Sequence, residues 1–166
     1  MVSLPQIGLR AWTFLWTLLA LALVSNVIAD AFSGNPSSIN YAEFTAVWCM
    51  LVVLVGIAGA FVELPAMILG GLDVSAALLS LIAGIVLAAR LHVHSCGNRS
   101  YLVSNSLTNG SHNMGKRCHE LQASCAFFWF MFVGFLGSAI VGLMGGGSGF
   151  SRRGGMRKGG PSMSQV

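Results

Sequence analysis

Hydrophobic residues along the chain gather into four long runs that polar stretches separate. The runs cover residues 11–29, 42–62, 72–91 and 121–144. Each run is close to the ~20 residues that a helix needs to cross the hydrocarbon of a bilayer. The link around Leu64-Pro65 is short, so the runs beside it form a helical hairpin. The pattern predicts an all-α membrane protein, a bundle of four antiparallel transmembrane helices.

Composition supports this class of protein. Hydrophobic residues make up 55% of the chain and charged residues only 8%, whereas about 25% of a soluble domain is charged. The net charge of +4 is carried mainly by the loop between the third and fourth runs and by the C-terminal tail. Charge at these places suits lipid headgroups, and we expect no nucleic-acid partner.

The first run also admits another interpretation, a cleaved signal peptide. It follows Arg10, and Ala29-Asp30-Ala31 resembles a cleavage site between small residues. The apolar part of a signal peptide has about 7–15 residues, however, and this run is longer. We therefore favour a transmembrane helix.

Four spans place both chain ends on one face of the membrane and the loops at 30–41 and 92–120 on the other. Basic residues near the spans usually mark the cytoplasmic face. Five basic residues accompany the chain ends, and four lie in the long loop. The first group is Arg10, Arg152, Arg153, Arg157 and Lys158, and the second is Arg90, Arg99, Lys116 and Arg117. The counts are nearly equal, so this rule does not decide which face is cytoplasmic.

Two other features of the long loop favour the exoplasmic side. Asn98-Arg99-Ser100 and Asn109-Gly110-Ser111 fit the glycosylation acceptor pattern. Cys96 and Cys118 stand near the ends of the loop, where a disulfide would suit an oxidising compartment. Two unrelated reduced thiols are the alternative. We expect residues 1–10 and 145–166 to be cytoplasmic.

The histidines of the loop raise the question of a metal site. His92, His94 and His119 lie beside the two cysteines, and zinc binds both residue types. Their spacing matches no usual ligand pair. We expect exposed histidines, and neither a metal nor a cofactor.

Small residues recur four positions apart within the spans, which places them on one helix face. That spacing lets helix backbones approach closely, either inside the bundle or between two chains. The candidates for packing or self-association are Gly84, Gly134, Ser138 and Gly142.

Catalysis and ion-coupled transport are disfavoured. The charged residues fall at or near span ends, with Asp73 expected in the first turn of the third span. Pumps and carriers usually hold charge inside their spans. We find no metalloprotease, hydrolase or phosphate-loop motif, so we expect no enzyme.

Several motifs resemble the fungal non-classical export protein 2 family along the whole chain. They are HSCGNRSY from His94, Arg117-Cys118, ELP from Glu63 with Leu72-Asp73, and the ending GSGFSRR…PSMSQV. The resemblance implies a four-span MARVEL domain with cytoplasmic ends and a Cys96–Cys118 disulfide outside. It also implies residence in plasma-membrane microdomains associated with eisosomes, and a part in their response to sphingolipids.

The sequence and this resemblance together predict a non-enzymatic plasma-membrane protein that organises lateral microdomains. Its expected partners are membrane lipids (sphingolipid, sterol or anionic lipid), further copies of itself and eisosome scaffold proteins. The alternatives are an export carrier or channel and a vesicle cargo adaptor.

The tail generates a first testable prediction. Arg152, Arg153, Arg157 and Lys158 lie close to the fourth span, where each would add ~1 kcal/mol of attraction to anionic lipid. Replacing all four by Gln should therefore release a peptide of residues 145–166 from anionic liposomes in a sedimentation assay. Neutral liposomes are the control. Unchanged binding of the Gln peptide would mean that the basic residues serve topology alone.

Overall fold

The computed structural model describes the backbone of residues 4–153 except positions 33, 60, 63 and 93, and the side chains of that range as far as residue 145. The described residues form helices joined by short irregular segments, so the chain is all-α as the sequence predicts. The helices are α1 (Leu4–Ala29), α2 (Ser37–Ala58), α3 (Ala66–Leu91), α4 (Arg99–Ser104) and α5 (Met114–Arg153).

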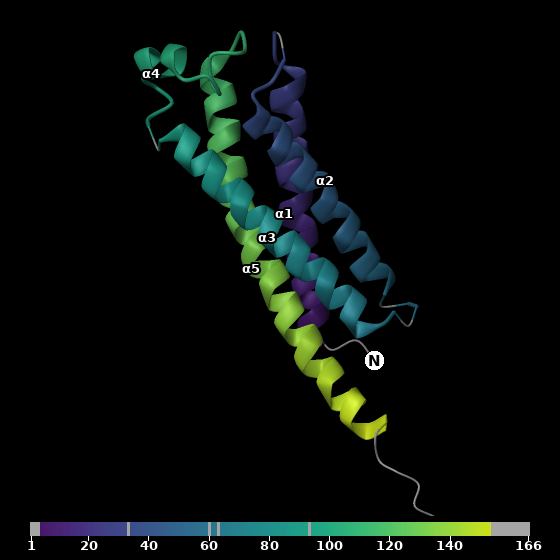
Figure 1. The fold of residues 1–166 in the computed structure, drawn as a ribbon. Coiled ribbons are helices and arrows are strands. Elements are labelled where there is room, and N and C mark those ends of the chain that lie inside the picture. The colour runs from purple at the N-terminus through teal and green to yellow at the C-terminus, as the bar shows by residue number, and fades with distance from the viewer. Residues whose placement is uncertain (1–3, 33, 60, 63, 93, 154–166) are drawn as a thin grey trace, which may run out of the picture.

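The four long helices lie side by side in a ring. Helix α1 packs against α2 and α5, and α3 packs against the same two neighbours, which leaves α1 and α3 on a diagonal. Successive long helices run in opposite directions (Figure 1). The α1–α2 link and α4 share one end of the bundle, called here the α4 end. The α2–α3 link marks the opposite end, the hairpin end, where α1 begins and α5 finishes.

All four long helices are long and apolar enough to cross a membrane: Leu4–Ala29, Ser37–Ala58, Ala66–Leu91 and Met114–Gly145. They correspond to the four hydrophobic runs, but three of them begin six or seven residues earlier than the runs do. Prolines mark two of the helix starts, since Pro36 and Pro65 immediately precede α2 and α3 in an extended conformation. Proline fits a helix start because it has no N–H to donate.

The fourth long helix also extends beyond its hydrophobic run. The sequence ends the fourth span at Met144, whereas α5 continues to Arg153. The helix therefore extends into the segment that the sequence assigns to the tail. The remaining tail, with Arg157 and Lys158, lies outside the described residues, and so do the side chains of Arg152 and Arg153.

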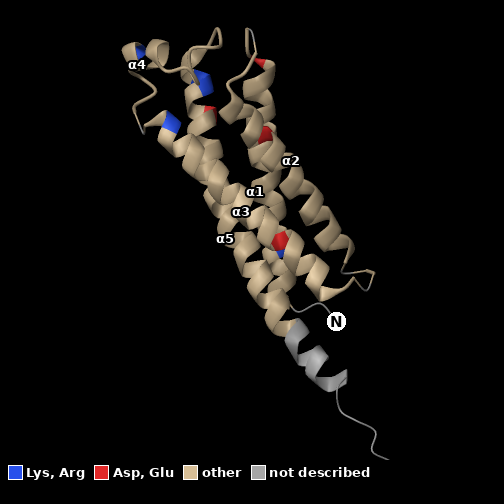
Figure 2. Ribbon diagram, viewed as in Figure 1, with Lys and Arg blue, Asp and Glu red and all other residues tan. Residues whose placement is uncertain are grey.

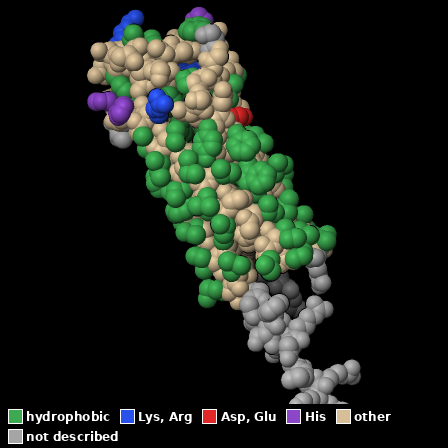
Figure 3. Space-filling model, in the orientation of Figure 1, with side chains coloured by type: hydrophobic (Ala, Val, Ile, Leu, Met, Phe, Trp, Pro, Cys, Tyr) green, Lys and Arg blue, Asp and Glu red, His purple; other side chains and the backbone are tan. Residues whose placement is uncertain are grey.

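The bundle is apolar inside and outside. Its core combines small residues such as Ala20, Ala46 and Ala76 with the bulky Phe128 and Phe135 of α5, all fully buried. Large hydrophobic side chains are also exposed along the outside of the shaft. On the face shown in Figure 3 they cover much of the shaft, whereas charged groups gather toward the α4 end. A helix that is apolar all round is typical of a membrane span.

Charged residues are distributed in the same uneven way. Most of them lie toward the α4 end, and one red position with blue beside it stands alone in the hairpin half of the shaft (Figure 2). That position is the ion pair between Arg10 of α1 and Asp73 of α3.

Candidate functional site

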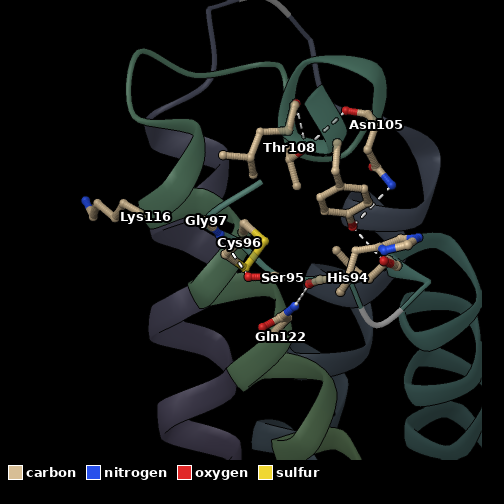
Figure 4. The surroundings of a disulfide bond; sticks show 12 residues. His94, Ser95, Cys96, Gly97, Asn105, Thr108, Lys116 and Gln122 are labelled. Carbon is tan, nitrogen blue, oxygen red and sulfur yellow. Dashed lines mark hydrogen bonds between the residues drawn. A yellow bond between two sulfur atoms is a disulfide. The ribbon is translucent and has the colours of Figure 1, made fainter. Parts of the chain in front are cut away.

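The long polar loop folds into a compact structure at the α4 end. Cys96 and Cys118 form a disulfide with their Cα atoms 5.7 Å apart, which confirms the expected pairing. The bond joins the segment after α3 to the beginning of α5, beside Gln122 (Figure 4). Gln122 Nε2 donates to the carbonyl of His94 at 2.8 Å, so the same two segments are joined twice.

Helix α4 and the residues after it are held by hydrogen bonds to their own backbone and to α3. Asn98 caps α4 through its side-chain oxygen. The Tyr101 hydroxyl donates to the carbonyl of Leu91 at 2.6 Å, and burial raises the pKa of Tyr101, which favours this neutral donor form. Thr108 donates to the carbonyl of Leu102 at 2.8 Å. The loop is therefore ordered at its base and within itself.

Arg117 is the buried centre of this end. Only 2% of its surface is exposed. Its guanidinium donates to the carbonyl of Leu107 at 2.7 Å, to that of Val27 in α1 at 2.7 Å, and to Asn35 Oδ1 at 3.0 Å. It thereby joins α5 to α1, to the α1–α2 link and to the loop. Sequence reasoning used Arg117 as a loop charge and as part of the Arg117-Cys118 motif, and missed this role.

The two glycosylation acceptors occupy different surroundings. Asn98 and Ser100 are both exposed, whereas Asn109 is exposed and its partner Ser111 is buried. Asn98 uses only its oxygen in capping α4. The geometry thus leaves the first acceptor more accessible, and glycosylation stays a prediction.

The histidines do not gather around the two cysteines. His94 packs against Tyr101, with ring centroids 5.0 Å apart, and His112 packs against Phe32 at 4.0 Å. Because Cys96 and Cys118 bond each other, the metal interpretation loses both of its sulfur ligands.

A second constellation lies inside the shaft. Arg10 Nη1 and Nη2 donate to the two carboxylate oxygens of Asp73 at 2.6 and 2.7 Å. The two residues are only 6% and 1% exposed. The pair spans the diagonal between α1 and α3. A bidentate contact of this kind neutralises both charges and fixes their geometry.

Gly56 of α2 makes room for this pair. A Cβ atom on Gly56 would meet the guanidinium of Arg10, at 2.6 Å from Nε and at a shorter distance from Cζ. Helices α1, α2 and α3 therefore meet at one buried ion pair.

The sequence did not predict this arrangement. It assigned Arg10 to a cytoplasmic end and Asp73 to the first turn of a helix, but α1 begins at Leu4 and α3 at Ala66. Both residues consequently lie about two turns inside their helices. The sequence did contain one indication of this contact. Arg10 and Asp73 have opposite charges, each lies at an end of an apolar run, and both ends belong to the same end of the expected bundle.

Further polar pairs hold the α4 half of the shaft. Ser25 donates to Glu43 Oε1 at 2.7 Å and ties α1 to α2. Asn26 donates to Glu120 Oε1 at 2.6 Å and ties α1 to α5. Helix α1 thus has a polar contact with each of the other long helices, although most of its residues are apolar.

The predicted small residues divide into interior and open positions. A Cβ on Gly84 would lie 3.2 Å from Trp129 Nε1, and one on Gly134 would lie 2.6 Å from Thr13 Cγ2. Ser138 is fully buried. Nothing described lies within 4 Å of a Cβ on Gly142. The structure places the first three on interior faces of the bundle and leaves Gly142 open.

Comparisons with known proteins agree with this architecture. The profile of the MARVEL family, a membrane-associating domain, matches residues 2–141. The chain is 32% identical over 177 residues to non-classical export protein 2 of Saccharomyces cerevisiae, with full coverage of both chains. It is 33% identical over 153 residues to a non-classical export protein 2 homolog of Schizosaccharomyces pombe, which covers 85% of this chain and 80% of the relative. No solved structure matches the chain.

Gly134 and Gly142 provide a matched pair of variants on α5. Gly134→Leu should disrupt the bundle, because its side chain would overlap Thr13 and Trp12 of α1. Gly142→Leu should leave the bundle intact, since that position is open. Thermal unfolding of the two detergent-solubilised variants measures the difference. Equal stability of both variants would place the Gly134 face outside the bundle.

The buried ion pair allows a test with a compensating variant. Asp73→Asn leaves the Arg10 charge buried without its partner and should lower the free energy of unfolding by about 3–5 kcal/mol. The double variant Arg10→Met with Asp73→Leu removes both charges and should recover most of that loss.

Unfolding by sodium dodecyl sulfate, followed by circular dichroism, provides the measurement for both variants. If Asp73→Asn were as stable as the parent chain, or if the double variant were the less stable of the two, the pair would have no part in holding the shaft together.

Proposed function

The chain belongs to the MARVEL family of membrane-associating proteins, within the group of the non-classical export protein 2 homologues, and from that premise we propose that it organises lateral microdomains of the plasma membrane. In this role it acts without catalysis. The bundle associates with further copies of itself and with particular lipids, and the resulting patch is stabilised.

The observation that carries this proposal is the outer surface of the shaft. Large hydrophobic side chains are exposed on all four long helices, for example Leu15 on α1, Leu51 on α2, Ile85 on α3 and Val133 on α5. Most of the described polar side chains of the shaft, by contrast, are paired inside it. The surface available for interaction is therefore the one that meets lipid and neighbouring membrane proteins.

The helices are long enough for the proposed spans. Helix α2 has 22 residues, which correspond to about 33 Å at 1.5 Å per residue. Helices α1 and α3 have 26 residues each and accommodate a bilayer of similar thickness by tilting.

The disulfide supports the proposed sidedness. Disulfides persist in oxidising compartments, so the α4 end, with Cys96, Cys118 and the acceptors Asn98 and Asn109, faces the exterior. The hairpin end and both chain ends then face the cytoplasm. On that side the basic tail would meet anionic lipid, and eisosome scaffold proteins would meet the bundle.

Self-association would use faces that the bundle itself leaves open. Gly84, Gly134 and Ser138 serve interior contacts. Gly142 remains open, and Ile140 and Leu143 near it on α5 are exposed. We propose this part of α5 as a contact between copies.

An export carrier is the second candidate, and two observations favour it. The relatives are named non-classical export proteins, and Arg10 and Asp73 place charge inside the spans, where carriers often hold it. The two charges satisfy each other, however, at 2.6 and 2.7 Å. A pair of this kind stabilises the shaft without requiring a substrate.

Two experiments separate these functions. The tagged full-length protein, imaged in a yeast cell together with a marker of the eisosome scaffold, should gather in patches that coincide with the marker. Deletion of the gene for the protein should disperse the other proteins of these patches. A uniform distribution would contradict lateral organisation.

Proteoliposomes loaded with a reporter protein should show no release, whereas release that depends on the chain would establish the carrier.

A further inference from the structure

A small polar cavity lies at the α4 end, between the last turn of α3 and the residues around α4. Its volume is about 330 Å³, at the lower end of the range of about 300–1,000 Å³ for small-molecule sites. Its walls include Arg90, His92 and His94 from the end of α3 and the segment after it, and Tyr101 and Asn105 from α4 and its C-cap. Every lining residue has a polar side chain, so the cavity suits a polar ligand.

Three of the lining side chains are basic, and all three are exposed: Arg90, His92 and His94. Among the residues that the structure describes, none forms an ion pair with them or a hydrogen bond to their side chains. No acidic residue lines the cavity. Figure 3 shows histidine and basic side chains close together at this end. The cavity therefore presents a guanidinium charge that no carboxylate neutralises.

Basic residues often stand at a helix C-terminus because they complement its free carbonyls. At the end of α3, however, neutral donors already serve these carbonyls. Asn105 Nδ2 donates to the carbonyl of Arg90 at 2.8 Å, and the Tyr101 hydroxyl donates to that of Leu91 at 2.6 Å. The basic side chains are thus not used as caps, and their donors remain available to a ligand.

His92 occupies a backbone position that favours a different residue. It follows α3 in the left-handed conformation, with φ 50° and ψ 20°. Within the described part of the chain it is the only non-glycine residue with a positive φ. Glycine or asparagine is usual at this place, because a larger side chain is strained there. Strain of this kind concentrates at functional sites, which points to a use for the imidazole beyond ending the helix.

The free groups of the cavity are mainly hydrogen-bond donors. A guanidinium has five N–H groups and accepts no hydrogen bond, and each imidazole has at least one N–H. The side-chain oxygen of Asn105, by contrast, already accepts from the N–H of Leu107 at 2.9 Å. Such a set fits an anion. A phosphate group fits better than a carboxylate, because it carries about −1.5 to −2 charges near neutral pH and offers more oxygens to a bidentate arginine.

We propose that this cavity binds the phosphate group of a water-soluble phosphate ester. Its polar walls offer little apolar surface for an acyl chain, so the ligand is recognised without a lipid tail. Arg90 donates to two phosphate oxygens, and His92 and His94 donate to the others. The proposed sidedness would bring this ligand from outside the cell. Binding itself needs only the folded α4 end, so it does not depend on lateral organisation.

The test measures binding of glycerol 3-phosphate to the full-length protein in maltoside micelles, which contain no phosphate, by phosphorus nuclear magnetic resonance. Arg90→Gln should weaken binding about ten- to hundredfold, the value of a hydrogen bond to a charged group. Arg99→Gln on α4 is the matched control, because Arg99 is also exposed but does not line the cavity. It should leave binding unchanged. Equal losses in both variants would mean general attraction to a basic loop and would overturn the proposal.

A further variant separates binding from folding. Asparagine adopts the left-handed conformation more readily than histidine, so His92→Asn should be at least as stable as the parent protein in thermal unfolding. It should nevertheless bind glycerol 3-phosphate about two- to tenfold more weakly. The proposal fails if this affinity is unchanged, or if glucuronate binds as tightly as the phosphate ester. It also fails if phosphate binds only as the headgroup of phosphatidic acid added to the micelles, whatever the patch imaging shows.

Discussion

Inside a bilayer, polar side chains must find partners within the protein, because the lipid supplies no hydrogen bonds. This constraint explains which helices are joined and where. Arg10 of α1 reaches Asp73 across the bundle, while Ser25 and Asn26 reach Glu43 and Glu120 on the neighbouring helices. Close packing at small residues such as Gly84 and Gly134 also fixes the helices against one another. The polar contacts act together with this packing to align the four helices along one another.

The features that the sequence predicts well are those that depend on composition along the chain. Four apolar runs are sufficient to predict four spans, because each backbone must form its own hydrogen bonds in the membrane. The Cys96–Cys118 bond follows from the hairpin of α3 and α5, which brings the two ends of the loop together. The starts of the helices were less accurate, since α3 extends back from its apolar run to Ala66, and Pro65 keeps the residue before it out of the helical conformation.

The features that the sequence did not predict depend on contacts between distant residues. Arg117 contacts α1 and the α1–α2 link from the start of α5, and no local pattern indicates that its charge is buried. The role of Gly56 is visible only once Arg10 is placed against it.

The disulfide limits the motions that the bundle can undergo. It fastens the residues just beyond Leu91 to the first turns of α5, with Cα atoms 5.7 Å apart. Because Cys96 lies only five residues beyond the end of α3, the bond restricts the sliding of α3 along α5 at that end. Rotation about the α4 end is restricted less, and its amplitude grows with distance from that end. Displacement of the helices in response to the bilayer is therefore greatest in the hairpin half, which lies farthest from the disulfide.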